Sequence, residues 1–357
     1  MRTLWQITFK KNMIRYFANI GNKKREGRIF KMNSENKEEY IYAGIPTFMG
    51  GKFISEHEIK DYDIVFLGVP CDYGASYRLG AKYAPRQLRE YSFWDRIYGE
   101  ELYDLDHNKY IKSNNLKIAD LGDVYVVPTS PSANQDAIMK KVYSITKYSF
   151  PLVCGGDHSI TYGSFKGFYK AISENYPDYE VGLIHFDAHL DVEDRYLNMP
   201  DVWHGNVFRK LIEDGCLNAK NMYTIGPRGV VGKEWFDYVE EKGINLYTAN
   251  KVKEKGILNI IKEITNKNKN KRIKFYITFD IDCIDVSYIF GTGTPQCNGL
   301  TPYECDEALR NLNELDIAGF DIVELNPKLD PSNTSFVIAE EIIYHFLAFG
   351  LNRGNKK

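Results

Sequence analysis

The sequence predicts one α/β domain built on a parallel sheet of about eight strands, with helices on both faces. Short runs rich in β-branched and aromatic residues recur along the chain, and longer helix-like segments separate them. Most of these runs are apolar throughout and do not alternate, as expected of parallel strands covered on both faces. Alternation of strands with helices favours a parallel sheet with right-handed crossovers.

The eight expected strands cover residues 63–70, 116–122, 150–156, 181–188, 222–226, 244–248, 274–280 and 317–325. Residues 132–149 and 301–316 have helical character, and the second segment starts with Thr301, Pro302 and Glu304, a suitable N-cap, first-turn proline and N3 acid. The charged run 265–274 is expected to be a solvated loop before a strand. No linker rich in Gly, Ser or Pro divides the chain, so we expect residues 32–357 to form a single domain.

Residues 1–31 differ from the rest of the chain because they hold nine Lys or Arg residues and one acid, Glu26. A basic, acid-poor segment is typical of an organellar targeting peptide. The alternative is a disordered leader before a working protein that opens at Met32. In either case we expect this segment to lie outside the fold.

The composition excludes several classes of partner. A net charge of −2 gives no reason to expect nucleic acid or an anionic membrane surface. No apolar run reaches the roughly eighteen residues that a membrane span needs. The six cysteines are scattered without a CxxC pair, which is typical of reduced thiols, so we expect a cytoplasmic protein without a disulfide framework.

Ionisable residues gather where four of the expected strands end. Asp157 and His158 follow the run 150–156, and Glu324 ends the run 317–325. The stretch "HFDAHLD" closes a third run, and "TFDIDCID", which contains Asp280, Asp282 and Asp285, closes the fourth. Each cluster alone could be a turn whose carboxylate accepts from backbone amides. Because ligands bind beyond the carboxyl ends of strands in an open α/β sheet, four clusters together predict one site.

The types of these residues point to metal ions. In an extended segment Asp187, His189 and Asp191 would project to one side, and Asp280 and Asp282 would do the same from another strand. With His158 the set has two imidazoles and four carboxylates, whose mutual repulsion two divalent cations would relieve. Oxygen-rich ligands without thiolates favour Mn²⁺ over Zn²⁺. Two metals about 3.5–4 Å apart can activate one water, so we expect metal-assisted hydrolysis.

At this point the sequence resembles the ureohydrolase (arginase/agmatinase) family. The motifs "CGGDHS", "FDAHLD", "WHGNVFR", "TFDIDCID", "GTGTP" and "DIVELNP" stand in the family's order, and the resemblance runs from about Gly44 to about Leu351. It implies a three-layer arginase-like fold. It also implies that one Mn²⁺ is held by His158, Asp187, Asp191 and Asp280, and the other by Asp187, His189, Asp280 and Asp282. Asp187 and Asp280 would then bridge the two ions.

The resemblance also implies roles in catalysis. Glu324 matches the acid that grips the substrate's guanidinium group, and His204 matches a mobile, proton-shuttling histidine. Asp191 would relay a proton to the leaving amine. Family members are usually trimers or hexamers, so a homo-oligomer is implied. Cys283 beside Asp282 is expected to pack in the core and not to bind metal.

Departures from the arginase pattern argue against arginine as the substrate. Glu193 and Pro200 stand where arginases carry Asn and Ser, and "PRGVVG" after the run 222–226 lacks an Asp. The segments "GIPTF", "LGDV" and "GTGTP" look like those of agmatinases. Glu193 or Asp194 could then pair with the distal ammonium of agmatine, giving putrescine and urea as products.

Other substrates stay open at this stage. Trp203, Asn206, Val207 and Gln296 are not typical of agmatinases, and Trp203 could narrow the pocket for a shorter substrate. Guanidinobutyrate, guanidinopropionate and guanidine are therefore alternatives, followed by arginine and formimidoylglutamate. A single-metal, deacetylase-like hydrolase and a pseudoenzyme are the alternatives of other classes. All six metal ligands and Glu324 are present, which disfavours both.

Overall fold

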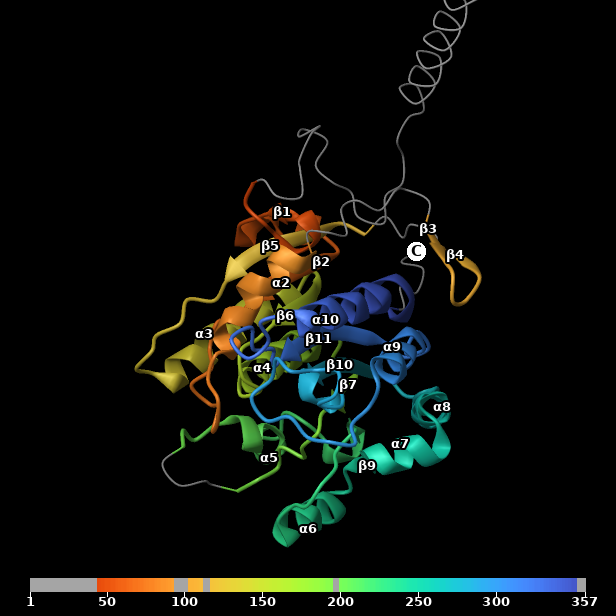
Figure 1. Ribbon diagram of the computed structural model, residues 1–357. Coiled ribbons are helices and arrows are strands. Elements are labelled where there is room, and N and C mark those ends of the chain that lie inside the picture. The colour runs from red at the N-terminus through yellow and green to blue at the C-terminus, as the bar shows by residue number, and fades with distance from the viewer. Residues whose placement is uncertain (1–43, 93–101, 112–115, 195–198, 352–357) are drawn as a thin grey trace, which may run out of the picture.

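The centre of the molecule is a parallel sheet of nine strands in the order β1-β5-β2-β6-β11-β10-β7-β8-β9 (Figure 1). The computed structural model describes residues 44–92, 102–111, 116–194 and 199–351. The strands of this sheet are β1 (Lys52–Phe53), β2 (Ile64–Gly68), β5 (Ile118–Asp123), β6 (Phe150–Cys154), β7 (Glu180–Phe186), β8 (Met222–Ile225), β9 (Asn245–Tyr247), β10 (Ile273–Asp280) and β11 (Ile317–Val323). The predicted parallel sheet is confirmed, and each of the eight expected strands is present.

Three strands were not expected. β1 is only two residues long and pairs with β5 at the edge of the sheet. β3 (Leu102–Asp104) and β4 (Lys109–Ile111) form a separate antiparallel hairpin. Runs of two or three residues are too short to show a hydrophobic pattern, so the sequence carries little signal for them.

The helices that pack on the sheet are α2 (Ala84–Ser92), α3 (Pro131–Thr146), α4 (Ile160–Asn175), α5 (Val207–Glu213), α6 (Lys233–Lys242), α7 (Ala249–Lys255), α8 (Ile257–Asn268), α9 (Pro302–Arg310) and α10 (Thr334–His345). Both expected helices are present. α9 begins with the expected capping box, in which Thr301 and Glu304 each accept from the other's backbone amide.

Two predicted boundaries are wrong. α9 ends at Arg310 and not at residue 316, because the chain turns there to enter β11. The run 265–274 is not all loop, because Thr265–Asn268 is the last turn of α8. Thr265 and Asn268 are buried, which explains why this polar stretch stays helical.

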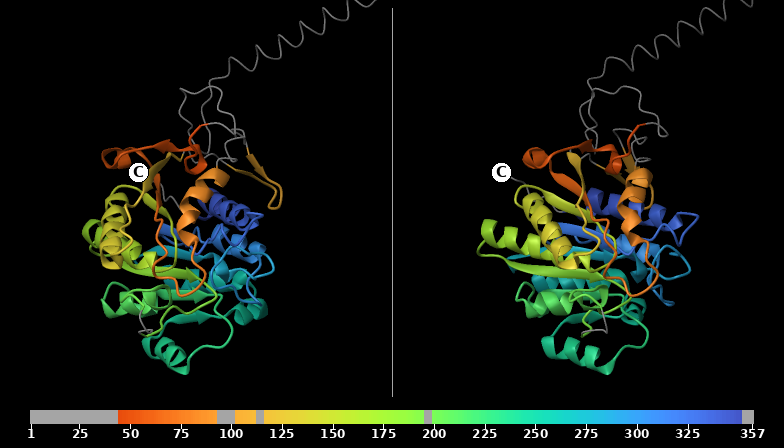
Figure 2. Two further views of the ribbon diagram at one scale, coloured as in Figure 1. Left: turned by 60° about the vertical axis from the view of Figure 1, so that its left-hand side comes forward. Right: turned by 90° about the vertical axis from the view of Figure 1, so that its left-hand side faces the viewer.

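Two hydrophobic cores lie on opposite faces of the sheet. In β2 the side chains of Ile64 and Phe66 join the core beneath α2 and α7–α10, and those of Val65 and Leu67 join the core beneath α3–α6. Because alternate side chains of a strand enter opposite cores, the sheet is covered by helices on both faces. Figure 2 shows this three-layer arrangement. The six cysteines are free thiols, and Cys283 packs in the core as expected. None of the helices in the described segments is long and apolar enough to cross a membrane. The basic segment 1–31 lies outside the described residues.

The strand order creates a topological switch point near the middle of the sheet. After β6 the chain continues at β7 and leaves two positions between these strands, which β10 and β11 fill later. The carboxyl ends of β6, β11, β10 and β7 are therefore adjacent. The direction of winding changes at this point, which is where open α/β sheets form ligand sites.

A buried ion-pair network anchors α2 to the sheet. Arg89 Nε and one terminal nitrogen donate to the two oxygens of Asp120 at 2.7 and 3.0 Å, and the other terminal nitrogen donates to Asp123 at 2.7 Å. Asp120 is fully buried and also accepts from the backbone amide of Phe48 at 2.9 Å. Loss of the guanidinium would leave this carboxylate without its counter-charge.

We therefore expect Arg89→Met to lower the free energy of unfolding by about 3–5 kcal/mol, because it strands a buried charge. Urea denaturation followed by circular dichroism measures the change. Lys233→Met removes a charge from the exposed pair with Asp237 on α6 and should leave the denaturation midpoint nearly unchanged. Equal midpoints for the two variants would contradict the assigned role of Arg89.

Candidate metal centre

The strands β6, β7 and β10 bring the predicted ligands to one edge of the sheet. His158 lies in the turn after β6, Asp187 directly follows β7, Asp280 ends β10, and Asp282 lies in the short 3-10 turn after it. All four side chains are buried. The edge that the sequence predicted as the site is therefore where these residues meet.

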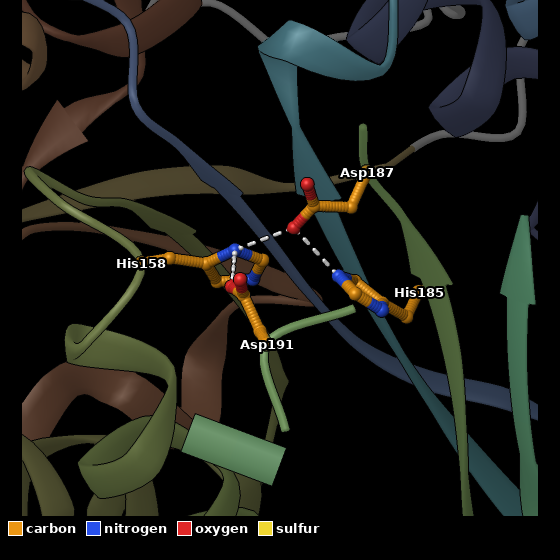
Figure 3. Close-up of side chains that lie close together, drawn as sticks. All are labelled: His158, His185, Asp187 and Asp191. Carbon is orange, nitrogen blue, oxygen red and sulfur yellow. Dashed lines mark hydrogen bonds and ion pairs between the residues drawn. The ribbon is translucent and has the colours of Figure 1, made fainter. Parts of the chain in front are cut away.

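His158 faces three carboxylates with one ring nitrogen. Its Nδ1 lies 3.0 Å from Asp187, 3.0 Å from Asp191 and 3.2 Å from Asp280. Figure 3 shows the first two of these contacts. The other nitrogen, Nε2, lies 2.9 Å from Thr278 Oγ1. Nδ1 nevertheless meets the geometry of a hydrogen bond with none of the three carboxylates. A buried imidazole nitrogen among three carboxylates is the arrangement that a divalent cation fits.

Asp187 joins this group to a second one. Its Oδ2 faces His158, and its Oδ1 lies 3.2 Å from Nδ1 of His189, which in turn is 3.2 Å from Asp282 Oδ2. Ligand atoms of Asp187, His189 and Asp282 lie within 4.8 Å of one another. The same holds for a second group, made up of His158, His185, Asp187 and Asp191. One carboxylate therefore points its two oxygens at two candidate metal positions.

Burial and neighbouring carboxylates destabilise the charged forms of Asp280 and Asp191. Burial and then the neighbouring Asp282 and Asp187 raise the pKa of Asp280 well above its ordinary value. Burial and then Asp187 raise the pKa of Asp191. Such a cluster needs positive charge nearby, and bound cations supply it. The residues present thus fit a pair of metal ions.

The reason given for this convergence from the sequence was wrong. β7 ends at Phe186, and the chain then bends, with the amide of His189 donating to Asp187 Oδ1 at 2.6 Å. Asp191 has a φ of +50°, a left-handed conformation that is rare outside glycine. Asp282 likewise lies beyond its strand. The side chains meet because the backbone turns, and not because an extended segment alternates.

Sequence reasoning missed His185, which lies in β7 itself. Its Nε2 is 2.8 Å from Asp187 Oδ2 (Figure 3), and its Nδ1 is 3.4 Å from Thr224 Oγ1. The signal was present, because His185 is an ionisable residue only two positions before Asp187. His185 is fully buried, and its contact orients Asp187.

Asp157 and Asp285 have structural positions. Asp157 accepts from the amides of Gly74 and Ser159, both at 2.8 Å, as the simple turn interpretation predicted. Asp285 accepts from the amides of Ser287 and Gly299 and holds its own loop together. These contacts explain why neither side chain joins the candidate metal ligands.

Glu324 and His204 form a pair beside the metal ligands. Glu324 Oε1 accepts from the backbone amide of His158 at 3.1 Å and lies 3.0 Å from His204 Nδ1. Burial alone would lower the pKa of His204, but the hydrogen bond to Glu324 together with the negative charges of Glu324, Asp191 and Asp157 raises this pKa to about 9. Glu324 has a φ of +63°, a second left-handed residue in the site. Strained backbone at such a position is typical of functional residues.

The loop expected to cover the substrate is described on both sides of residues 195–198. Glu193 is half-buried, and its amide donates to Gly205 at 2.8 Å, beside His204. Asp194 is 79% exposed and lies 3.8 Å from Arg209. Trp203 is buried, and its ring packs against Gly205, where an added Cβ would come within 2.5 Å of it. Trp203 therefore supports the loop from beneath.

Arg228, shortly after β8, is a further residue to which the sequence assigned no role. Arg228 occupies the segment where an Asp was noted as missing, and its guanidinium donates to the carbonyls of Asp282, Cys283 and Gln296 at 2.8–3.1 Å. These contacts fix the turn that carries Asp282 to the neighbouring loop. Because the guanidinium serves several carbonyls, Arg228 acts as a brace for the ligand turn.

Comparison with known proteins gives concordant results. The family model of the arginase family matches residues 62–348. Among curated proteins, the mitochondrial guanidino acid hydrolase of Homo sapiens is 34% identical over 80% of this chain and 77% of its own length. The mitochondrial agmatinase of Gallus gallus is 33% identical over 80% of each chain.

Solved structures give the same result. The proclavaminate amidino hydrolase of Streptomyces clavuligerus superposes with a TM-score of 0.75 at 29% identity. The match covers 87% of this chain and 99% of that one. The likeness therefore extends over most of the chain and is not confined to the metal-ligand motifs.

We expect Asp187→Asn to lower the bound metal from two ions per chain to fewer than one, because Asp187 faces both groups of ligands. Elemental analysis of the purified protein measures the metal content. Asp285→Asn is the matched control, since Asp285 follows the same strand as Asp282 but points into its own loop. If the Asp187 variant retained two ions per chain, the assignment of Asp187 would be wrong.

Proposed function

This chain belongs to the arginase family, and from that premise we propose that it hydrolyses agmatine to putrescine and urea with two bound Mn²⁺ ions. As an arginase-family hydrolase it acts on guanidino compounds, and its relatives include an agmatinase and a guanidino acid hydrolase. The choice of agmatine rests on one observation. Glu193 is a half-buried carboxylate at the covering loop, and no basic side chain of the described residues pairs with it.

His158, Asp187, Asp191 and Asp280 would hold one ion, and Asp187, His189, Asp280 and Asp282 the other. When bound, the two ions supply a water that is nucleophilic at neutral pH. The absence of thiolates supports Mn²⁺ as the metal. The orphaned Nδ1 of His158 and the raised pKa of Asp280 support this ligand set, because a cation would satisfy both.

Glu324 orients the substrate. Its Oε1 is occupied by His158 N and His204, so Oε2 is the oxygen left to accept from the guanidinium. A Cβ atom added at Gly293 would lie 3.5 Å from Oε2. Glycine at this position therefore leaves space beside the carboxylate. Holding the guanidinium carbon in place before attack removes much of the entropic cost of the reaction.

Asp191 and His204 move protons. Asp191 accepts the proton that the attacking water loses and passes it to the leaving amine, so that putrescine departs and urea remains. His204 exchanges protons between the site and the solvent, and its contact with Glu324 keeps it within reach of the substrate.

Burial and then the nearby Asp191 raise the pKa of Glu193 to about 7. A substrate ammonium beside Glu193 would offset this burial, which a carboxylate on the substrate would not. This difference favours agmatine over guanidinobutyrate and guanidinopropionate, which end in carboxylates. A homo-oligomer, trimeric or hexameric, and a cytoplasmic location complete the proposal.

The function is tested by measuring urea release by the Mn²⁺-loaded protein. Agmatine should give the largest kcat/KM in a panel with arginine, guanidinobutyrate, guanidinopropionate and guanidine. Metal removal with a chelator should abolish urea release, and Mn²⁺ should restore it. A preference for guanidinobutyrate or guanidinopropionate would show that the substrate is a guanidino acid and not agmatine. Absence of urea from every compound would refute the proposal that the protein is a guanidino hydrolase.

Glu193→Gln should raise the KM for agmatine by about tenfold or more and leave kcat within about twofold, because it removes a charge-assisted contact distant from the reacting carbon. Steady-state kinetics measure both constants. Asp194→Asn is the matched control, because Asp194 is exposed and faces Arg209. If both variants raised KM equally, charge on the loop and not a contact of Glu193 would explain the effect.

A further inference from the structure

The loop between β2 and the 3-10 turn Ala81–Tyr83 packs closely against the site. The amide of Gly74 donates to Asp157 at 2.8 Å, and the carbonyl of Gly74 accepts from the amide of His204 at 3.1 Å. A Cβ on Gly74 would come within 2.5 Å of Ser159 Oγ. The backbone of this loop is therefore fixed both to the turn that precedes α4 and to the backbone of His204.

Two residues further on, Ser76 contacts the side chain of His204 in two ways. Its Oγ lies 2.8 Å from His204 Nε2, and its backbone amide donates to the same nitrogen at 3.2 Å. The other ring nitrogen, Nδ1, lies 3.0 Å from Glu324. The imidazole is thus held at both ends, by a buried carboxylate on one side and by Ser76 on the other.

Ser76 is also more exposed than the ring that it contacts. Ser76 is exposed, whereas the side chain of His204 is 12% exposed and that of Glu324 only 4%. The hydrogen-bonded order from outside to inside is Ser76, His204 and Glu324. A proton that leaves the imidazole through Nε2 therefore meets the Ser76 hydroxyl first.

We propose that Ser76 is a positioning residue whose hydroxyl holds the His204 ring in both of its protonation states and connects it to bulk water. The inference rests on the proposed function, because it concerns proton transfer in the same site. Nothing in the motif "WHGNVFR" indicates it, since Ser76 and His204 are 128 residues apart in the chain.

The chemistry of the hydroxyl explains why a serine suits this place. A hydroxyl can donate to Nε2 when the imidazole is neutral and can accept from it when the imidazole is protonated. The backbone amide of Ser76 can only donate. With alanine at this position the amide alone would face Nε2, and it would oppose a proton there. The hydroxyl therefore offsets the preference for an unprotonated Nε2 that the backbone amide alone would impose.

The test compares Ser76→Ala and Ser76→Thr with wild-type enzyme on the substrate that wild type hydrolyses. We expect Ser76→Ala to lower kcat by about tenfold, less than the 10²–10⁴-fold effect of losing a general acid–base, with KM within about twofold. Ser76→Thr keeps the hydroxyl and should retain most of the turnover. Ser173→Ala, on the exposed surface of α4, is the control for loss of a serine hydroxyl elsewhere. Added imidazole buffer should restore part of the kcat of Ser76→Ala.

A second measurement does not depend on the substrate. Nitrogen-15 NMR of labelled histidine reports which ring nitrogen carries a proton, and His204→Asn identifies the signal of His204. In Ser76→Ala we expect Nε2 of His204 to be less protonated than in wild type or Ser76→Thr. An unchanged NMR signal and kcat in Ser76→Ala would overturn the inference. Equal losses in the Ala and Thr variants would also overturn it, since the hydroxyl would not be the cause. Failure of wild type to release urea refutes the function alone, because the NMR result still decides the inference.

Discussion

Mutual repulsion among buried carboxylates is the constraint on which the rest of the site depends. Asp187, Asp191, Asp280 and Asp282 lie at one edge of the sheet, and all four are buried. Water cannot screen these charges, so the fold must hold them in place by other means. Backbone amides, Thr294 and Arg228 do this for Asp282 and its turn, and His185 does it for Asp187. Bound cations would balance the remaining negative charge.

The strand order brings the mutually repelling carboxylates together at the candidate metal centre. β10 and β11 enter the gap between β6 and β7, so residues that are far apart in the sequence become neighbours at the carboxyl edge. Both cores continue beneath this edge, and the hydrophobic layers on the two faces stabilise a fold that contains an unfavourable polar cluster. Left-handed backbone at Asp191 and Glu324 marks the same edge. These costs are concentrated within one small region, as is typical of functional sites.

The sequence was sufficient for the sheet and for the region of the site, and insufficient for the local geometry. Continuous apolar runs such as 150–156 predicted their strands because burial on both faces leaves a clear pattern. The hairpin β3–β4 was missed because its strands are three residues long. The bend at His189 could not be foreseen, since it depends on an amide that donates to the preceding Asp187. His185 was overlooked because a histidine inside an apolar run has the same appearance as a core residue.

Contacts between distant loops are the part that no local pattern reveals. Arg228 and Ser76 carry no motif of their own, and each acquires its role through an atom that the fold brings to it. The acidic groups of the site, Glu324 and the aspartates, are buried. The neutral hydroxyl of Ser76 is exposed, and His204 lies between Ser76 and Glu324. An exposed neutral group can exchange with water without adding to the buried charge. This arrangement lets protons reach the site while the carboxylates stay shielded from solvent.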